Sequence, residues 1–164
     1  MRVEKDFREF IELLNKNNVK YLVVGGFAIA FHSIPRYTKD IDILVEPSKE
    51  NSKKLISALK QFGFGDIGLS EDSFQQLDQI IQLGYPPLRI DLLTSIIGVT
   101  VETAWKNREN GTYGDIPCYF ISKEDLIKNK KTAGRKQDIA DVESLTKVTD
   151  NDNYKLKTEK DGTK

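Results

Sequence analysis

The chain has 164 residues, enough for one domain with a packed core, and its 25 basic and 25 acidic side chains balance to a formal net charge of zero. This balance excludes a uniformly charged surface for loose binding of nucleic acid or membrane, so contact with a polyanion depends on a local patch. The single cysteine, Cys118, excludes an intramolecular disulfide and a cysteine-based metal cluster, as is typical of a reducing cytoplasm. No apolar run approaches the roughly 18 residues that a membrane span requires, and the first residues lack the apolar core of a signal peptide. We therefore expect a cytoplasmic protein without a membrane partner.

The first half of the chain alternates helix and strand patterns. Phe7, Phe10, Ile11 and Leu14 recur at helical spacing and predict an amphipathic helix that ends at the asparagine pair 17–18. Four elements follow in this order: a buried strand at 20–24, a short helix from the glycine pair to Pro35, a strand at 38–46, and a helix at 48–63 between Ser48 as N-cap and Gly63 as terminator.

The second half also mixes strands and helices. The patterns predict strands at 78–85 and 88–94, a helix at 100–109, a strand at 116–122, a helix from Ser122 to Gly134, and a last helix at 136–147 with Ile139, Val142 and Leu145 at helical spacing. Residues 110–115 have mostly turn character. The polar end, 148–164, has little to bury and is predicted to be a flexible tail. The mixture indicates an α+β fold with α/β-like features, in which helices flank a small mixed sheet.

Two acids interrupt the apolar strand at 38–46. Side chains alternate across a strand, so Asp40 and Asp42 point to one face, and Thr38 joins them if the strand begins early. Two carboxylates on one face repel each other, and a divalent cation would compensate their charge. Asp91 lies within another apolar strand and offers a third carboxylate, so that three acids on two strands suit two metal ions in phosphoryl transfer.

A glycine pair ends the strand at 20–24 and starts the next helix. The first N–H groups of a helix are free, and together with the positive end of the helix dipole they bind phosphate. Gly25 and Gly26 would let a phosphate approach the backbone closely. The segment from Val23 to Val45 thus combines a candidate anion seat with a candidate metal seat.

The order of these motifs resembles a known signature. An apolar residue, Gly25-Gly26, a gap of 13 residues and then Asp-Ile-Asp-Ile at 40–43 is similar to the signature of the DNA polymerase beta-like nucleotidyltransferase superfamily, and Asp91 matches its third carboxylate. The segments at 25–45, 83–99 and 125–145 resemble small nucleotidyltransferases related to toxin–antitoxin and abortive-infection enzymes and to antibiotic-modifying enzymes. The likeness covers residues 5–147. One departure is Ser33, which follows His32 where many relatives have glycine.

The resemblance implies a fold, cofactors and residue roles. It implies a nucleotidyltransferase domain at 1–147, with a catalytic core at about 19–121 and C-terminal helices at about 122–147. Two Mg²⁺ or Mn²⁺ ions would be held by the acids, and a nucleoside triphosphate would be the substrate. The expected catalytic and metal residues are Asp40, Asp42 and Asp91. The expected nucleotide-binding residues are Gly25, Gly26, Arg36, Thr38, Lys128, Lys131 and Arg135.

Several residues keep a second interpretation. The alternative to a metal ligand at Asp91 is a structural partner for Arg89 or another base. The alternative to a phosphate contact at Arg36 is a surface ion pair with the acids. His32, the only histidine, fits packing or capping better than contact with the triphosphate. The six bases between Lys123 and Lys136 fit either a phosphate or RNA site or a solvated helix face whose basic end complements the helix dipole. Cys118 is expected in the core.

The sequence leaves the acceptor of the nucleotide open. A tRNA or other RNA end, a protein hydroxyl and a small molecule are the candidates; neutral net charge disfavours a large RNA, and the basic segment favours it. A toxin role with an antitoxin or accessory partner follows from the resemblance alone. The rival hypothesis is a non-catalytic interaction protein with a nucleotidyltransferase fold, against which the presence of all three acids speaks.

Overall fold

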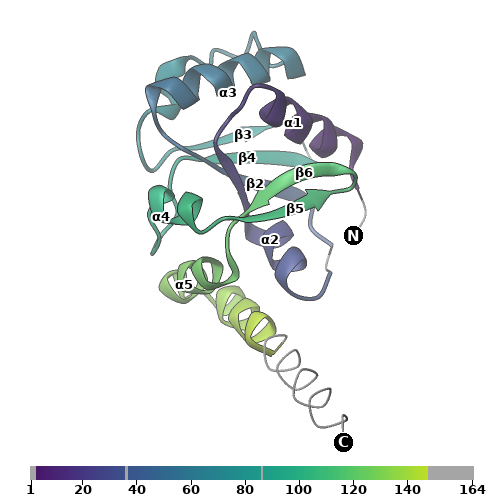
Figure 1. Cartoon of the computed structure of the whole chain (residues 1–164), viewed down its shortest axis with the longest axis vertical. Helices are drawn as coiled ribbons and strands as arrows, with labels where there is room; N and C mark the ends of the chain where they lie inside the picture. The colour runs from purple at the N-terminus through teal and green to yellow at the C-terminus, as the bar shows by residue number, and fades with distance from the viewer. Residues whose placement is uncertain (1–2, 36, 86, 148–164) are drawn as a thin grey trace, which may run out of the picture.

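The computed structural model describes residues 3–35, 37–85 and 87–147 as a six-stranded sheet with helices on both faces (Figure 1). The strands, in the spatial order β3-β4-β2-β1-β6-β5, are β1 (Tyr21–Val24), β2 (Asp40–Val45), β3 (Ile80–Leu83), β4 (Arg89–Leu93), β5 (Glu109–Tyr113) and β6 (Ile116–Phe120). The sheet is mixed, since β1 pairs parallel with β6 and β2 pairs parallel with β4, whereas the other pairs are antiparallel. The predicted α+β class is confirmed.

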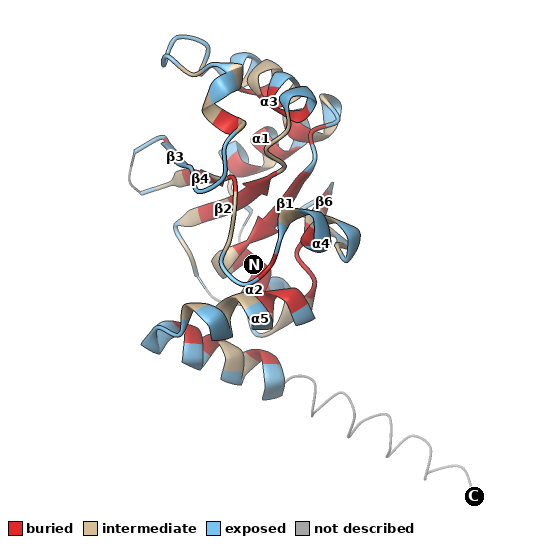
Figure 2. Cartoon of the chain, turned by 90° about the vertical axis from the view of Figure 1, so that its left-hand side faces the viewer, coloured by how far each residue is buried: buried red, intermediate tan, exposed pale blue. Residues whose placement is uncertain are grey.

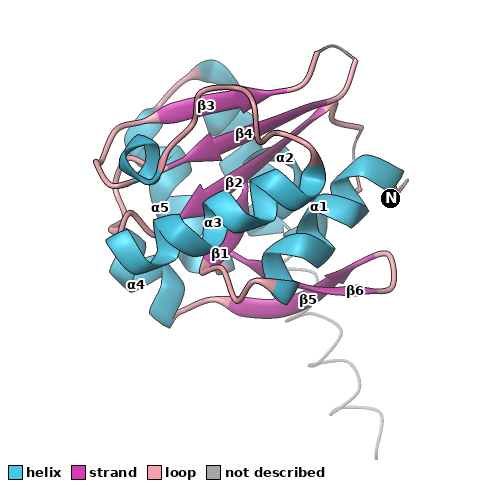
Figure 3. Cartoon of the chain, turned by 90° about the horizontal axis from the view of Figure 1, so that it is seen from above, coloured by secondary structure: helices cyan, strands magenta, loops and turns pink. Residues whose placement is uncertain are grey.

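The helices form one layer on each side of the sheet. They are α1 (Lys5–Lys16), α2 (Gly25–His32), α3 (Lys49–Phe62), α4 (Val101–Lys106) and α5 (Lys123–Ala133), with a 3₁₀ turn at Glu71–Phe74 and a further helix at 136–147. Viewed from above, α1 and α3 lie together over one face, and α2 and α5 lie behind the sheet (Figure 3). None of the helices in the described residues is long and apolar enough to cross a membrane.

Most boundaries follow local sequence chemistry. The hydroxyl of Ser48 accepts a hydrogen bond from the Asn51 amide at the start of α3, and Ser122 does the same for Asp125 at the start of α5. Gly63 and Gly134 end these helices with φ values of +105° and +66°, which suit glycine. The predicted caps are therefore confirmed. Ser33 has a φ of −142°, so this position does not require glycine.

One expectation from the sequence was wrong, and the last predicted helix is confirmed with an unexpected buried face. Residues 110–113 belong to β5 rather than to a turn, because Glu109–Tyr113 pairs with β6 along its whole length. In the last helix, Ile139 is 62% exposed, whereas Asp138, Asp141 and Leu145 are buried. The buried face of this helix therefore contains two acids as well as Leu145. Figure 2 shows buried and exposed residues alternating along the helix that follows α5.

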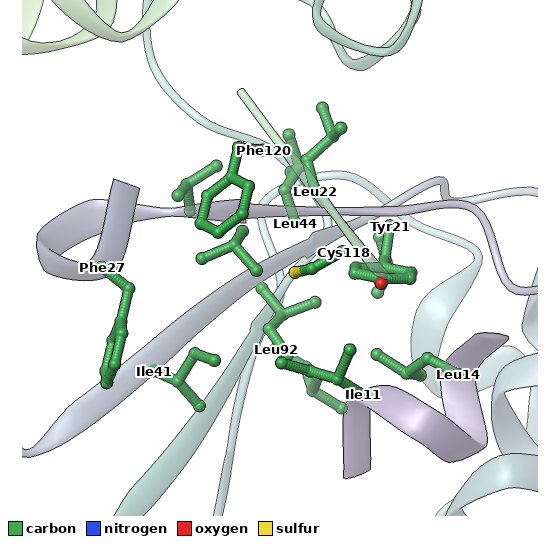
Figure 4. Packing of buried hydrophobic residues seen from close by; sticks show 14 of the residues in the cluster. Ile11, Leu14, Tyr21, Leu22, Phe27, Ile41, Leu44, Leu92, Cys118 and Phe120 are labelled. Carbon is green, nitrogen blue, oxygen red and sulfur yellow. The ribbon is translucent and has the colours of Figure 1, made fainter. Parts of the chain in front are cut away.

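The core lies between α1, α3 and the sheet and extends to α2 (Figure 4). Ile41 and Ile43 of β2 are 1% and 0% exposed and face away from the acids of the same strand. Cys118 is buried beside Tyr21, as expected, and burial raises the pKa of its thiol to about 12. This packing fixes β2 and β4, and with them the acids on their other face.

Candidate active site

Three carboxylates meet on the sheet face that α2 and α5 border. β2 and β4 are parallel neighbours, and their register places Asp42 directly beside Asp91 and Asp40 beside Arg89. Alternation along each strand puts all four side chains on the same face. The structure thus brings together the three acids that the sequence singled out, while their catalytic role stays a prediction.

Arg89 lies between two of these acids. Its Nε donates to Asp91 Oδ1 at 2.8 Å, and its Nη2 donates both to Asp91 Oδ2 and to Asp40 Oδ2 at 3.1 Å. The alternative interpretation of Asp91 as a partner of Arg89 is therefore correct as a description of this pairing. The Arg89 side chain is 32% exposed and the Asp91 side chain 10%, so the base lies at the solvent edge of the cluster and the acid lies beneath it.

Asp42 has a different electrostatic environment. Burial, together with the nearby charges of Asp91 and Asp40, raises the pKa of its carboxyl to about 6, and Lys130 acts in the opposite direction. The raised pKa means that the charged form of Asp42 is poorly compensated. An additional cation beside Asp42 would therefore lower the free energy of this cluster.

The carboxylate oxygens of Asp40, Asp42 and Asp91 are of the type that binds a hard divalent cation, but their arrangement in this structure is not that of a complete ligand shell. Within the described part of the chain, no three acids, histidines or cysteines converge closely enough to hold a metal ion. The Arg89 Nη2 nitrogen is a stand-in cation, because it contacts an oxygen of both Asp40 and Asp91. Carboxylate oxygens are preferred ligands of Mg²⁺, so the residues fit the ion once Arg89 moves aside.

The glycine pair forms the adjoining side of the site. Gly25 has a φ of +64°, and a Cβ at this position would overlap the Asp42 carboxylate. A Cβ on Gly26 would lie 3.1 Å from the hydroxyl oxygen of Thr38, which itself donates to the Asp40 carbonyl oxygen at 3.2 Å. Val24 precedes α2 without a side-chain cap, so the first amides of the helix remain available to an anion. The absence of side chains at 25 and 26 therefore lets the Asp42 carboxylate and the Thr38 hydroxyl lie against the start of α2.

Lys130 is one of the six bases between Lys123 and Lys136, and it was not singled out from the sequence. Its side chain is only 11% exposed, its Nζ lies 3.2 Å from Asp138 Oδ1 and 3.4 Å from Asp141 Oδ2, and its charge acts on Asp42. Lys130 follows the buried Leu126 by four residues and so lies on the inward face of α5. This spacing, with two acids three residues apart on the next helix, was the available signal.

The other predicted nucleotide-binding bases lie further out. Lys128 and Lys131 are exposed on α5. Arg135 is 76% exposed and its Nε donates to Asp138 Oδ2 at 2.7 Å. Arg36 lies outside the described residues, as does the predicted tail at 148–164.

His32 has a packing environment. Its side chain is 6% exposed, its Nε2 lies 2.7 Å from the carbonyl oxygen of Ile121, and its ring packs edge-on against Phe31. These contacts tie the end of α2 to the strand end after β6. They agree with the packing interpretation.

Comparisons with known proteins agree with this geometry. Residues 2–160 match the family described as "Nucleotidyltransferase of unknown function (DUF6036)". The structure is also similar to the lincomycin-bound crystal structure of the lincosamide antibiotic adenylyltransferase LnuA, with a TM-score of 0.55 and 18% sequence identity over 87% of this chain and 96% of that chain. A search of curated proteins returned no match.

The class of protein is thereby defined. Since the family match spans nearly the whole sequence, the chain belongs to the DUF6036 nucleotidyltransferase family. It is a transferase of the kind that moves nucleotidyl groups, and the likeness to LnuA shows a shared fold.

Proposed function

We propose that the protein transfers a nucleoside monophosphate from a nucleoside triphosphate to an acceptor hydroxyl. The observation that carries the proposal is the position of Asp42, a poorly compensated carboxylate between Asp91 and the side-chain-free start of α2. Such an arrangement suits a substrate that brings cations and phosphates together.

The acids would hold the divalent cations, Mg²⁺ or Mn²⁺, which two-metal transferases use to neutralise phosphate charge and to lower the pKa of the attacking hydroxyl. Asp40, Asp42 and Asp91 provide the oxygen ligands. Arg89, displaced from the acids, stays at the rim as a base within reach of phosphate oxygens. The three carboxylates thus fix the position of the reacting groups.

The start of α2 would hold the β- and γ-phosphates through the amides around Gly25 and Gly26, with Thr38 alongside. Lys130, kept in place by Asp138 and Asp141, adds positive charge next to Asp42. In the reaction, the acceptor oxygen forms a bond to the α-phosphorus, the bond to the β-phosphate oxygen breaks, and pyrophosphate leaves with that electron pair. Asp91 or solvent takes the hydroxyl proton.

Thermal denaturation with ATP, GTP, CTP or UTP and Mn²⁺ tests triphosphate binding. At least one triphosphate should raise the melting temperature of the wild-type protein, and Asp42→Asn should remove most of that shift. No shift with any of the four would favour the rival hypothesis of a non-catalytic interaction protein. The toxin role and an antitoxin partner stay predictions from sequence resemblance, and co-purification of a tagged chain from its own host tests them.

A further inference from the structure

A cavity of about 1100 Å³ lies at the ends of β2 and β4 that are opposite to Asp40 and Arg89, and none of the three acids lines it. It is bounded by the segment that leads into β3, by the turns after β2 and β4, by Lys20 before β1 and by α4. Three of its apolar lining residues are largely exposed, namely Leu77 (60%), Ile80 (64%) and Ile97 (57%). The size is that of a site for a small organic molecule.

The strand register connects this cavity with the catalytic face. Gln82 of β3 is paired with Asp91 of β4, and Ile80 is paired with Leu93, so Ile80, Gln82 and Asp91 share one face. Ile80 lies two residues from Gln82, which is about 7 Å along the strand. The wall of the cavity therefore begins one side-chain row away from the acids.

The cavity and the start of α2 lie at opposite ends of the strands, since Lys20 precedes β1 whereas Gly25 follows it. Across the sheet, Gln82, Asp91 and Asp42 follow one another, and Gly25 comes after β1, the next strand. In phosphoryl transfer the attacking and leaving oxygens are roughly in line. If pyrophosphate leaves on the side of Gly25, the hydroxyl attacks from the opposite side, which a molecule in the cavity can reach along the row of Ile80 and Gln82.

The charge of the lining selects among acceptors. The described residues that line the cavity include one base, Lys20, against three acids, Glu46, Asp78 and Glu102. Lys20 already lies 3.3 Å from Glu46. A nucleic-acid end requires basic side chains to neutralise its phosphates, and this lining has the opposite balance. Apolar walls with a few acids suit a neutral or cationic molecule.

On the basis of the proposed function, we propose that the cavity is the acceptor site and that the acceptor is a small, neutral or cationic molecule with an apolar part and a hydroxyl group. Its apolar part lies against Ile80 and Ile97. Its hydroxyl extends past Gln82 to the acids, where the oxygen takes the nucleotidyl group, pyrophosphate leaves and the proton passes to Asp91 or solvent.

The test follows the label from an α-³²P triphosphate with Mg²⁺ into three fractions of a cell extract: a filtrate below about 1 kDa, total RNA and total protein. The proposal expects label in the filtrate. Ile80→Arg, which puts bulk and positive charge into the wall, should reduce that labelling about tenfold or more. Ile67→Arg changes another exposed isoleucine, which does not line the cavity, and should leave labelling unchanged.

Triphosphate binding is measured in parallel by thermal denaturation with Mn²⁺. If the wild-type protein binds no triphosphate, the proposed function itself fails. If it binds a triphosphate but labels RNA, protein or no fraction, the acceptor proposal is overturned. Equal labelling of the filtrate by the wild-type protein and by Ile80→Arg, with binding intact in both, overturns it as well.

Discussion

The chain contains two clusters of acidic side chains that neighbour Lys130, and they have opposite electrostatic environments. Asp138 is fully buried, and hydrogen bonds from Arg135 and Lys130 lower the pKa of its carboxyl to about 2. Asp42 lies among other acids, and burial and like charge raise its pKa to about 6. Burial of an acid therefore does not by itself indicate a functional site. The acid whose charge is left poorly compensated is the better candidate.

The largest difference between the two clusters should appear in catalysis. Asp42→Asn should reduce nucleotidyl transfer roughly 10³-fold or more, the order expected when a group that positions transition-state charge is lost. The fold should remain intact, and the melting temperature of the ligand-free protein should rise slightly because a like-charge contact is removed. Labelled transfer and thermal denaturation measure both effects. A marked loss of stability would instead assign Asp42 a structural role.

The Asp138 cluster should respond in the opposite way, through stability. Asp138→Asn should lower the free energy of unfolding by about 3–5 kcal/mol, since it removes the negative charge beside Lys130 and Arg135 in a buried site. Asp115→Asn is the matched control, because Asp115 also has a pKa lowered to about 2, by Arg8, but is 72% exposed. Its loss should be much smaller, because exposed ion pairs contribute little to stability. Urea denaturation compares the two variants, and equal losses would contradict the distinction.

A glycine substitution tests the contact between the start of α2 and the Asp42 carboxylate. Gly25→Ala should cost about 2–3 kcal/mol, since an alanine with positive φ is strained and its Cβ also overlaps the Asp42 carboxylate. Gly134→Ala has nearly the same φ, +66°, with its nearest neighbour at 3.7 Å, so it shows the cost of the backbone strain alone. Chemical denaturation gives both values. If the two variants lose the same stability, Gly25 is not in contact with the acid.

The pH dependence of stability tests the raised pKa of Asp42. The pKa of Asp42 is about 6 in the folded state and about 4 when unfolded, so its protonated form stabilises the fold below pH 4. This stabilisation, about 3 kcal/mol, should disappear as the pH rises through 6. The difference between the wild-type protein and Asp42→Asn, measured by urea denaturation from pH 4 to 7, isolates this contribution. A difference that does not change with pH would contradict the raised pKa.

Strong local patterns made most of the fold predictable. The caps at Ser48 and Ser122, the glycine stops and the apolar strands around Asp42 and Asp91 each have a local physical cause. The strand β5 has no such local cause, because Asn110, Gly111 and Thr112 carry little apolar surface. Gly111 is needed there for packing, since a Cβ would lie 2.7 Å from the ring of Phe31, which stacks on Phe120. That requirement comes from residues distant in sequence.

The candidate active site was also predictable only in part. Alternation along two strands was enough to place the three acids on one face, and the parallel neighbourhood of β2 and β4 then brought them together. The bridging of Asp40 by Arg89 depends on the register between strands, which the sequence does not reveal. Likewise, the spacing from Leu126 indicates that Lys130 faces inward, but its pairing with Asp138 and Asp141 depends on how the last helix packs.

The central claim is that the acids around Asp42 form a cation site in which Arg89 stands in for a metal ion. Calorimetric titration of Mn²⁺ into the wild-type protein, Asp42→Asn and Arg89→Gln tests this claim most directly. The account predicts weak binding by the wild-type protein, tighter binding by Arg89→Gln because the competing guanidinium is gone, and loss of binding in Asp42→Asn. Manganese affinity that neither substitution changes would contradict it.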